Sequence, residues 1–423
     1  MAMDKIEIRG GGDLHGTIRV SGAKNAALPI MAAALLARGC SLIENIPRLR
    51  DVETMLGILR RLGVKGGFVG PNSLELDCAG RLDPVAPYDL VRKMRASVLV
   101  LGPLLARGGR AVVSLPGGCV IGPRPVGLHL SCLHGLGADV KVSHGYIEAE
   151  TPGLSGGEVQ AGGPGGPSVG ATINSLLAAT GAEGTTTIRQ AAREPEVVDT
   201  AFFLQAMGAR IEGVGSETIV VEGGHPLSPT QYRIIPDRIE AGTYLLAGAL
   251  AGRDLRLEGA EPPHLTSLLS VLEKTGIPVT QQGGGLQVNA GPPQGGLTIS
   301  TAAYPGFPTD MQAQVTVLLS LAAGESRIEE TVFPDRFMHV PELNRLGADI
   351  LVKKANAIIR GVPGLAGAPV MASDLRASAA LVLAGLVAEG TTTIRRIYHL
   401  DRGYERMVEK LQTVGARIKR IKD

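Results

Sequence analysis

One structural pattern recurs six times along the chain. In each copy a helix-like stretch ends in an apolar residue or threonine, glycine follows, and a strand-like stretch begins. Successive glycines of this pattern lie 74, 71, 68, 71 and 68 residues apart, at Gly63, Gly137, Gly208, Gly276, Gly347 and Gly415. Glycine at a helix end is typical of a C-cap in the left-handed conformation. Copies of this length are too large for a solenoid of small repeats, so the pattern favours two domains of three copies each.

A second marker runs in phase with these glycines. The heptapeptide Glu-Gly-Thr-Thr-Thr-Ile-Arg occurs at residues 183–189 and again at 389–395. Each copy contains one amphipathic helix pattern, as at residues 52–62, and one that is apolar nearly all round, as at 26–37. A helix that is apolar on every side is expected to be buried. The sequence therefore predicts an α/β protein in which sheets surround buried helices.

The longest glycine-rich stretch covers residues 153–170. It lacks the Gly-Lys-Ser/Thr ending of a phosphate-binding loop and has no dinucleotide-binding fingerprint. We therefore predict that this stretch is a mobile connector rather than a phosphate site.

Composition and charge exclude several classes of protein. The 423 residues carry 42 basic and 40 acidic side chains and only 3% aromatics, which argues against a dedicated nucleic-acid surface. The longest apolar runs, at 96–106 and 377–388, are too short to cross a bilayer, and the N-terminus does not resemble a signal peptide. The four cysteines show no metal-ligand spacing. A cytoplasmic protein without a metal, a nucleic-acid partner or a membrane segment is expected.

Several of the apolar helix patterns begin with a cationic side chain. Lys24, Arg95 and Arg376 occupy these first turns. A helix N-terminus already has positive potential, so an added cation there is unfavourable unless an anion is bound. One such residue could simply extend to solvent, but three in equivalent places indicate a site for a polyanion.

Three further arginines lie beside glycine, proline or aromatic residues. They are Arg124 in Gly-Pro-Arg-Pro, Arg336 in Asp-Arg-Phe-Met-His and Arg402 in Leu-Asp-Arg-Gly-Tyr. Arginine is suited to bidentate capture of phosphate and carboxylate. A structural salt bridge with the preceding aspartate is the competing interpretation, and it is stronger for Arg336 than for Arg402.

Two residues are candidates for proton transfer. Asp310 follows the stiff sequence Tyr-Pro-Gly-Phe-Pro-Thr at a helix start, where it is either an N-cap or a general base. Cys119 lies in a loop of glycines and prolines, five residues before Arg124. Its thiol is either an unreactive loop side chain or one whose pKa is lowered by cationic neighbours, in a loop able to close over a ligand.

The motifs together resemble the UDP-N-acetylglucosamine 1-carboxyvinyltransferases, a family of enolpyruvyl transferases. The resemblance runs over nearly the whole chain and rests on Ser-Gly-Ala-Lys-Asn-Ala-Ala-Leu-Pro, Met-Arg-Ala-Ser, Leu-Pro-Gly-Gly-Cys-x-Ile-Gly-x-Arg-Pro-Val, Ser-Val-Gly-Ala-Thr, Tyr-Pro-Gly-Phe-Pro-Thr-Asp-Met-Gln, Arg-Phe-Met-His-Val-Pro-Glu-Leu and Tyr-His-Leu-Asp-Arg-Gly-Tyr-Glu. It implies two inverse α/β barrels of three repeats each, with the active site in the cleft between them. It also implies that residues 1–22 join 236–423 in one domain and that 23–235 form the other.

The resemblance further implies transfer of enolpyruvyl from phosphoenolpyruvate to the 3-hydroxyl of UDP-N-acetylglucosamine, by addition and then elimination of phosphate. Neither a metal nor an organic cofactor is implied. Cys119 corresponds to the position that the antibiotic fosfomycin alkylates in the family. The implied catalytic residues are Cys119, Asp310 and Lys24; those for phosphoenolpyruvate are Lys24, Asn25, Arg124 and Arg402; those for the nucleotide sugar are Arg95, Arg124, Pro125, Val126, Gly127, Leu128, Ser168, Gly170, Asp310 and Val332; Arg336 and Arg376 are supporting arginines.

The chain departs from the family pattern at two positions near the expected nucleotide site. Many members have aspartate where this chain has Gly127, and some have lysine where it has Gly166. Two related alternatives are the shikimate-pathway transferase, which lacks the cysteine loop, and a paralogue for another nucleotide. A catalytically silent binding protein is the alternative of another class, but it would be expected to lose Cys119, Asp310 or Lys24.

Overall fold

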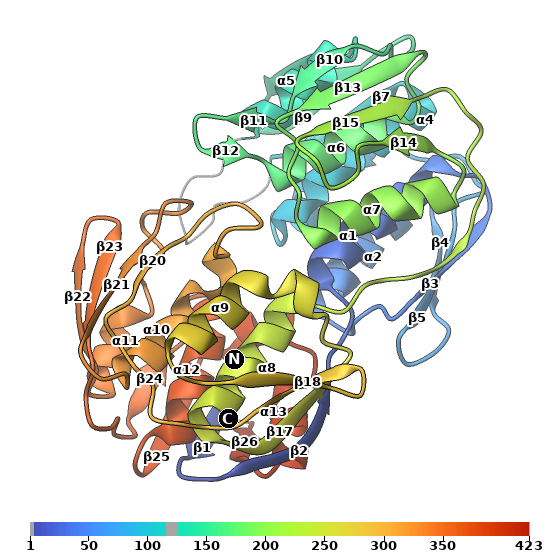
Figure 1. Ribbon diagram of the computed structural model, residues 1–423. Coiled ribbons are helices and arrows are strands. Elements are labelled where there is room, and N and C mark those ends of the chain that lie inside the picture. Colours follow the sequence, from blue (N-terminus) through green and yellow to red (C-terminus); the bar gives the residue numbers. More distant parts are fainter. Residues whose placement is uncertain (1–3, 116–125, 423) are drawn as a thin grey trace. The chain divides into compact units, whose positions relative to one another are not determined.

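The structure is a computed structural model that describes residues 4–115 and 126–422 (Figure 1). Its chain forms two compact units. The middle unit comprises residues 22–115 and 126–235, and the terminal unit comprises 4–21 and 236–422. Cys119, Arg124 and Pro125 lie outside the described residues.

The described strands form six four-stranded sheets that share one topology, together with one small hairpin. In every sheet an edge strand runs parallel to the second strand, and the third and fourth strands each run antiparallel to their neighbour. In the middle unit the sheets are β16 (Gln231–Arg233), β3 (Cys40–Glu44), β5 (Ser73–Asp77) and β4 (Lys65–Phe68); β6 (Val85–Ala86), β7 (Arg110–Ser114), β9 (Tyr146–Glu150) and β8 (Asp139–Ser143); and β10 (Glu158–Gln160), β13 (Thr185–Arg189), β15 (Thr218–Glu222) and β14 (Arg210–Glu212). In the terminal unit they are β2 (Leu14–Arg19), β17 (Gly252–Glu258), β19 (Gly285–Val288) and β18 (Val279–Gln282); β20 (Thr298–Ser300), β21 (Glu325–Glu329), β23 (Asn356–Arg360) and β22 (Asp349–Lys353); and β24 (Pro369–Met371), β25 (Thr391–Arg395), β1 (Lys5–Arg9) and β26 (Arg417–Ile421).

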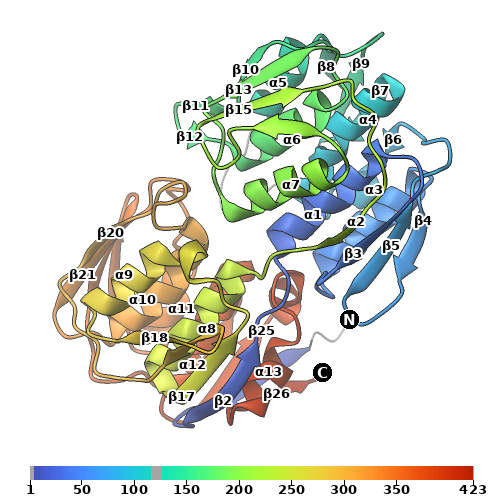
Figure 2. The same cartoon turned by 45° about the vertical axis from the view of Figure 1, so that its right-hand side comes forward.

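The helices divide into buried and half-exposed ones, as the sequence predicts. In α1, α6, α8, α10 and α12 nearly every side chain is buried, whereas α2, α9 and α13 bury only one face. Figures 1 and 2 show sheets on the outside of each unit and the buried helices inside. The middle unit contains α1 (Lys24–Ala33), η1 (Ala34–Leu36), α2 (Arg50–Arg61), α3 (Tyr88–Val91), η2 (Arg95–Val100), α4 (Leu101–Gly108), α5 (Gly127–Gly135), α6 (Val169–Ala179) and α7 (Pro195–Ala206). The terminal unit contains α8 (Arg238–Ala251), η3 (Pro262–His264), α9 (Thr266–Lys274), η4 (Thr309–Met311), α10 (Gln312–Ser320), α11 (Val340–Arg345), α12 (Leu375–Val387), η5 (Ile397–Arg402) and α13 (Met407–Thr413).

The six marker glycines all adopt the left-handed conformation. Their φ angles are 102°, 86°, 109°, 77°, 98° and 98° in chain order. At Gly63 a side chain would also meet the carbonyl oxygen of Arg81, at 2.9 Å from an added Cβ. The predicted C-cap glycines are therefore confirmed, because these positions favour the residue without a Cβ.

The terminal unit uses the start of the chain to complete its sheets. Strands β13 and β25 have the same sequence and the same burial pattern, but β13 pairs with the later strand β15 while β25 pairs with β1. The neighbouring β2 pairs parallel with β17, as β16 does with β3 in the middle unit. β1 therefore fills a place that in the other sheets belongs to a strand of the same stretch of chain, whereas β2, like β16, fills an edge place from a distant part of the chain.

One expectation needs correction. Residues 153–170, expected to be a mobile connector, contain β10 and a hairpin of β11 (Gly162–Gly163) and β12 (Gly166–Pro167). The α/β class with sheets around buried helices is confirmed (Figures 1 and 2), and the described four-stranded sheets remain separate in their hydrogen bonding. The glycines at 162, 163 and 166 serve a tight hairpin, which glycine-rich composition alone did not distinguish from a flexible segment.

Candidate active site

Lys24 is the first residue of the buried helix α1 in the middle unit. Its Nζ lies 3.4 Å from Oδ2 of Asp51 in α2, and the two side chains are only 11% and 6% exposed. Asn25 follows it in the same first turn. A buried ammonium at the positive end of a helix is placed where an anionic ligand would be stabilised.

Arg95 begins a short 3-10 helix, η2, which leads into α4. Its N-cap, Met94, has an extended backbone. The start of this segment packs against both α1 and α6. The sequence predicted a helix start here, and the structure adds that its first turns are tighter than an α-helix.

Helix α6 begins at a serine cap. The Ser168 Oγ accepts a hydrogen bond from the N–H of Ala171 at 3.3 Å. Gly170 lies in the first turn, and a Cβ there would approach Nε2 and Cε1 of His129 to 2.8 Å. The close approach of the imidazole to this turn therefore depends on glycine at position 170.

His129 is a functional candidate that the sequence reasoning missed. It lies on α5, which follows the N-cap Val126 and begins with Gly127 and Leu128. The signal was present in the sequence, because His129 is only two residues beyond Gly127. A lone histidine on an apolar helix nevertheless gives no hint of the partner across the core.

Asn174 of α6 fixes the tautomer of His129. The Asn174 Oδ1 accepts the N–H of Gly102 at 3.0 Å, and Nδ2 donates to the carbonyl of Val98 at 3.1 Å. The second hydrogen on Nδ2 is therefore directed at Nδ1 of His129, 3.1 Å away. An imidazole that accepts at Nδ1 carries its proton on Nε2, where no described residue accepts it.

The charge state of His129 follows from its surroundings. Burial, and secondarily the nearby guanidinium of Arg95, lower the pKa of this imidazole to about 4. His129 is therefore neutral near pH 7 and presents an Nε2–H donor beside the start of α6. A neutral donor, a serine cap and free helix N–H groups together suit an oxygen-rich ligand.

The two departures from the family pattern have different structural settings. A Cβ at Gly127 would meet no heavy atom within 4 Å. Gly166 has a φ of 92° in the β11–β12 hairpin, a conformation that residues with a side chain rarely adopt. Neither added Cβ would meet a heavy atom within 4 Å, so the two positions differ in backbone conformation, which disfavours a side chain only at Gly166.

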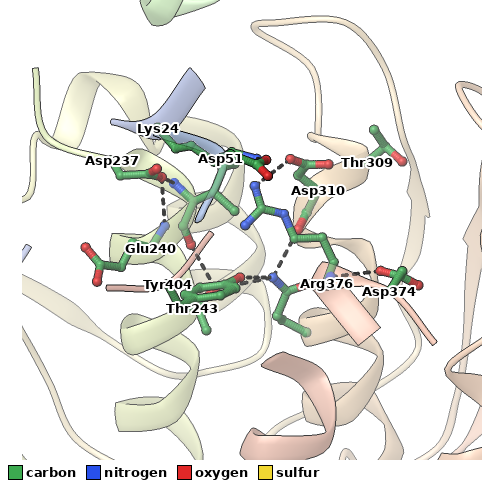
Figure 3. Close-up of polar contacts among 12 residues, drawn as sticks. Lys24, Asp51, Asp237, Glu240, Thr243, Thr309, Asp310, Asp374, Arg376 and Tyr404 are labelled. Carbon is green, nitrogen blue, oxygen red and sulfur yellow. Dashed lines mark hydrogen bonds and ion pairs between the residues drawn. The ribbon is translucent and has the colours of Figure 1, made fainter. Parts of the chain in front are cut away.

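Asp310 lies in the terminal unit on η4, directly before α10. Its Oδ1 accepts from Nη1 of Arg336 at 2.7 Å, and its Oδ2 accepts from Nη2 of Arg376 at 2.7 Å. The arginine side chains are 8% and 3% exposed, while that of Asp310 is 26% exposed. In Figure 3 the carboxylate of Asp310 faces the side chain of Arg376, which belongs to the first turn of α12.

These contacts decide two alternatives left open by the sequence. The carboxylate of Asp310 binds guanidinium groups, and η4 has no side-chain cap, so Asp310 is not an N-cap. Arg336 makes its ion pair with Asp310 rather than with the preceding aspartate. Asp237 and Asp374 are the capping aspartates, each accepting two backbone N–H groups at the start of α8 or α12.

The two arginines control the charge of Asp310. Burial by itself would raise the pKa of this carboxyl, but Arg376 and Arg336 outweigh that effect and hold its pKa well below the usual range. Burial opposes the charge of Arg376, and Asp310 reverses that effect and raises the arginine's pKa. The group is therefore fully ionised at neutral pH.

A buried hydrogen-bond network centred on Gln314 packs against Asp310 and Arg376. The two hydrogens of Gln314 Nε2 are shared among three acceptors, the carbonyl of Asp310 and the hydroxyls of Thr243 and Tyr404, at 3.0, 3.2 and 3.1 Å. The guanidinium of Arg376 lies 5.4 Å from the Tyr404 ring centre. Helices α8, α10 and α12 are thus joined around one ion-paired site (Figure 3).

Two other predicted residues lie in the terminal unit at element ends. The N–H of Val332, just after β21, donates to Oε1 of Glu330 at 3.0 Å. Arg402 is the last residue of η5 and is half-buried. The described chain contains no group of three or more possible metal ligands, and none of its helices could cross a membrane.

Comparison with known proteins decides the family. Residues 8–411 match the EPSP synthase (3-phosphoshikimate 1-carboxyvinyltransferase) family. The chain is 51% identical to the UDP-N-acetylglucosamine 1-carboxyvinyltransferase of Myxococcus xanthus, over 99% of this chain and all of the relative. It is 53% identical, with the same coverage, to the protein of that name in Solidesulfovibrio magneticus. The chain belongs to the enolpyruvyl transferase family.

Solved structures agree with this membership. The enolpyruvyl transferase NikO from Streptomyces tendae matches the full length of both chains with a TM-score of 0.90 and 28% identity. EPSP synthase from Acinetobacter baumannii has the same fold, with a TM-score of 0.77 at 19% identity. The protein is accordingly a carboxyvinyltransferase, and the question that remains for the site is which acceptor it uses.

Proposed function

We propose that this enzyme transfers the enolpyruvyl group of phosphoenolpyruvate to the 3-hydroxyl of UDP-N-acetylglucosamine and releases phosphate. This reaction is the first committed step of peptidoglycan precursor synthesis. The observation that carries the proposal is the 51–53% identity over 99% of the chain to enzymes named for this acceptor. Identity to the shikimate-pathway fold relative is only 19%. We also propose a cytoplasmic location, which the supply of phosphoenolpyruvate inside cells favours.

Most of the proposed nucleotide-sugar contacts belong to the middle unit. Gly170 offers a backbone donor at the start of α6, Ser168 offers its hydroxyl, and the neutral Nε2–H of His129 is a further donor to a ligand oxygen. Arg95 contributes positive charge. The remaining predicted contacts to this substrate are Arg124, Pro125, Val126, Gly127, Leu128, Asp310 and Val332.

The proposed chemistry has two balanced steps. In the addition, Asp310 takes the proton of the sugar 3-hydroxyl as its oxygen bonds to C2 of phosphoenolpyruvate, and Cys119 gives a proton to C3. In the elimination, C3 returns a proton to the Cys119 thiolate, the double bond re-forms, the bond from C2 to the phosphate oxygen breaks, and the proton on Asp310 leaves with the phosphate. Lys24, Asn25, Arg124 and Arg402 hold the phosphate and carboxylate, so that the charge on the departing phosphate is stabilised.

A phosphate-release assay tests the acceptor. The purified protein is incubated with phosphoenolpyruvate and, separately, UDP-N-acetylglucosamine, shikimate 3-phosphate and UMP. We expect phosphate release with the nucleotide sugar alone. Activity with shikimate 3-phosphate or UMP, and none with the nucleotide sugar, would show that the substrate assignment is wrong.

The role of Cys119 can be tested by substitution and by thiol labelling. The pKa of the Cys40 thiol is raised to about 11 by burial and by Glu75, and burial raises that of Cys78 to about 12 and also raises that of Cys132. At pH 7.5 we therefore expect one fast-labelled thiol per chain, absent from Cys119→Ser. That variant should lose most of its phosphate release while binding the nucleotide sugar normally in calorimetry. Unchanged phosphate release by Cys119→Ser would contradict the assigned role.

A further inference from the structure

The carboxylate proposed as the base is held in a state that makes it a poor base. Each oxygen of Asp310 accepts a 2.7 Å hydrogen bond from a different guanidinium. Nη1 of Arg336 also donates to the Thr309 hydroxyl at 3.1 Å, which fixes that arginine beside the carboxylate. A carboxylate paired with two buried cations accepts a proton from a sugar hydroxyl only with difficulty, because protonation would leave both cations without their counter-ion.

We propose that Arg336 and Arg376 are positioning residues that restrain Asp310 until anionic groups of the bound substrates engage these guanidiniums. The proposal rests on the proposed function, since it concerns the base of that reaction. Substrate anions would share or replace the ion pairs of Asp310, and the carboxylate would then become basic enough to take the hydroxyl proton. The base would thus be active only in the loaded site.

Arg376 has donor capacity available for such an anion. Its side chain is 3% exposed, yet its Nε has no hydrogen-bond partner among the described residues. A buried N–H without an acceptor is costly, and a substrate oxygen would remove that cost. The guanidinium therefore has a reason to bind an anion in addition to Asp310.

The other charged groups around the site are already engaged. Asp374 caps α12, Asp237 caps α8, and Glu330 accepts hydrogen bonds from Thr301 and Thr309. Burial lowers the pKa of His339 to about 4, so it is neutral near pH 7. Among the other titratable or charged groups of the packed elements, Tyr404 lies against Arg376 and Arg238 lies over the Tyr304 ring. Glu240 of α8 accepts a hydrogen bond from Lys410 at 2.7 Å, and Asp401 of η5 accepts two from Arg420. Asp310 is therefore the carboxylate on which the two guanidiniums converge.

The proposal has a kinetic signature. A pH profile of kcat/KM reports groups in the free enzyme, and a profile of kcat reports groups in the loaded enzyme. Since Asp310 is fully ionised when unliganded, it should produce no acid-side break in kcat/KM above pH 5. The loaded enzyme should show such a break in kcat, because its Asp310 binds a proton more readily.

A direct test follows the Asp310 carboxyl by NMR in protein labelled with ¹³C at aspartate side chains. The signal is assigned by its loss in Asp310→Asn. It is titrated from pH 8 to pH 5, first without ligands and then with UDP-N-acetylglucosamine and inorganic phosphate, which do not react together. We expect no midpoint in the free protein and a midpoint above pH 5 in the complex. Absence of a midpoint above pH 5 in the complex overturns the proposal.

A variant provides the second readout. Arg336→Gln keeps a side-chain amide donor but removes one cation, so an acid-side break should appear in kcat/KM where the wild type has none. The control Arg360→Gln removes an exposed arginine of the same unit, which pairs with Glu325 at 3.1 Å, and should leave the profile unchanged. A merely structural role for Arg336 would lower the yield of folded protein without adding this break, and that result also overturns the proposal.

The outcomes separate this proposal from the proposed function. Wild-type protein that releases no phosphate from phosphoenolpyruvate and UDP-N-acetylglucosamine contradicts the function itself. Active wild-type protein whose Asp310 titrates identically with and without ligands contradicts only the restraint by the two arginines.

Discussion

Helices α6 and α12 occupy equivalent places in two copies of the same repeat, but their first turns differ in chemistry. Each is buried along nearly its whole length and precedes a strand of sequence Thr-Thr-Thr-Ile-Arg. The start of α6 has a serine cap and faces the neutral His129. The start of α12 has an aspartate cap and carries Arg376, which is ion-paired with Asp310. The repeats therefore share their packing and differ at the turn that meets solvent.

This difference assigns the two turns to different tasks. Neutral donors bind a ligand oxygen without a strong preference for its charge, whereas a buried ion pair responds to any new charge brought beside it. We infer that the α6 turn contributes to recognition of the acceptor and that the α12 turn contributes to the reaction. Three substitutions test this division, in order of decreasing effect.

Asp310→Asn should have the largest effect. The amide keeps the shape of the side chain but cannot take the hydroxyl proton, so kcat should fall about 10²- to 10⁴-fold. The measurement is phosphate release at saturating substrates. Asp349→Asn, which alters an exposed aspartate 3.8 Å from Arg360, is the matched control and should be fully active. If the kcat of Asp310→Asn stays within threefold of the wild-type value, Asp310 is not the base and the α12 turn has no part in the reaction.

Gly170→Ala should have an intermediate effect confined to binding. The new Cβ would lie 2.8 Å from Nε2 and Cε1 of His129 and push the imidazole from the start of α6. KM for the nucleotide sugar should rise roughly tenfold, equivalent to about 1.4 kcal/mol, with kcat little changed. Gly57→Ala is the control, because a Cβ at that position of α2 would meet nothing within 4 Å. A fall in kcat with unchanged KM would reverse the proposed division.

Asn174→Asp should have the smallest effect at neutral pH, and one that depends on pH. The new carboxylate would favour the imidazolium form and raise the pKa of His129 above its wild-type value of about 4. Because the raised pKa means protonation at higher pH, affinity for the nucleotide sugar should change severalfold between pH 7.5 and pH 5.5. Wild type should show no such change from His129. Asn344→Asp, at an asparagine that bonds the backbone of Ile350, is the control.

A flat affinity profile in Asn174→Asp would show that His129 does not face the ligand. The imidazole Cε1 proton, followed by NMR, reports independently whether the pKa of His129 has moved. A moved pKa with unchanged affinity would place the histidine in a structural role.

The sequence was informative where a local pattern determines conformation. The six glycines, the buried helices and the α/β class follow from residue spacing and apolar content, and the structure agrees with each. The stretch 153–170 was mispredicted because glycine permits both a tight hairpin and a flexible segment, and only the pairing of Gly163 with Gly166 distinguishes them.

The site was less accessible to sequence reasoning because its contacts are distant along the chain. The spacing of 66 residues between Asp310 and Arg376 gives no sign that their side chains touch. The resemblance to the family named both residues, but only the geometry shows that Arg336 and Arg376 bind the same carboxylate. His129 escaped notice for the same reason, since its partner Asn174 lies 45 residues away.

The use of β1 in the last sheet has a consequence for synthesis on the ribosome. Ile6 pairs with Ile394, and Ile8 pairs with Ile418, so the first strand cannot find either partner until almost the whole chain has been made. The middle unit has all its strands by residue 233 and can fold while the rest is translated. During that interval β1 remains without its sheet, and a nascent-chain chaperone would have a long time to bind it.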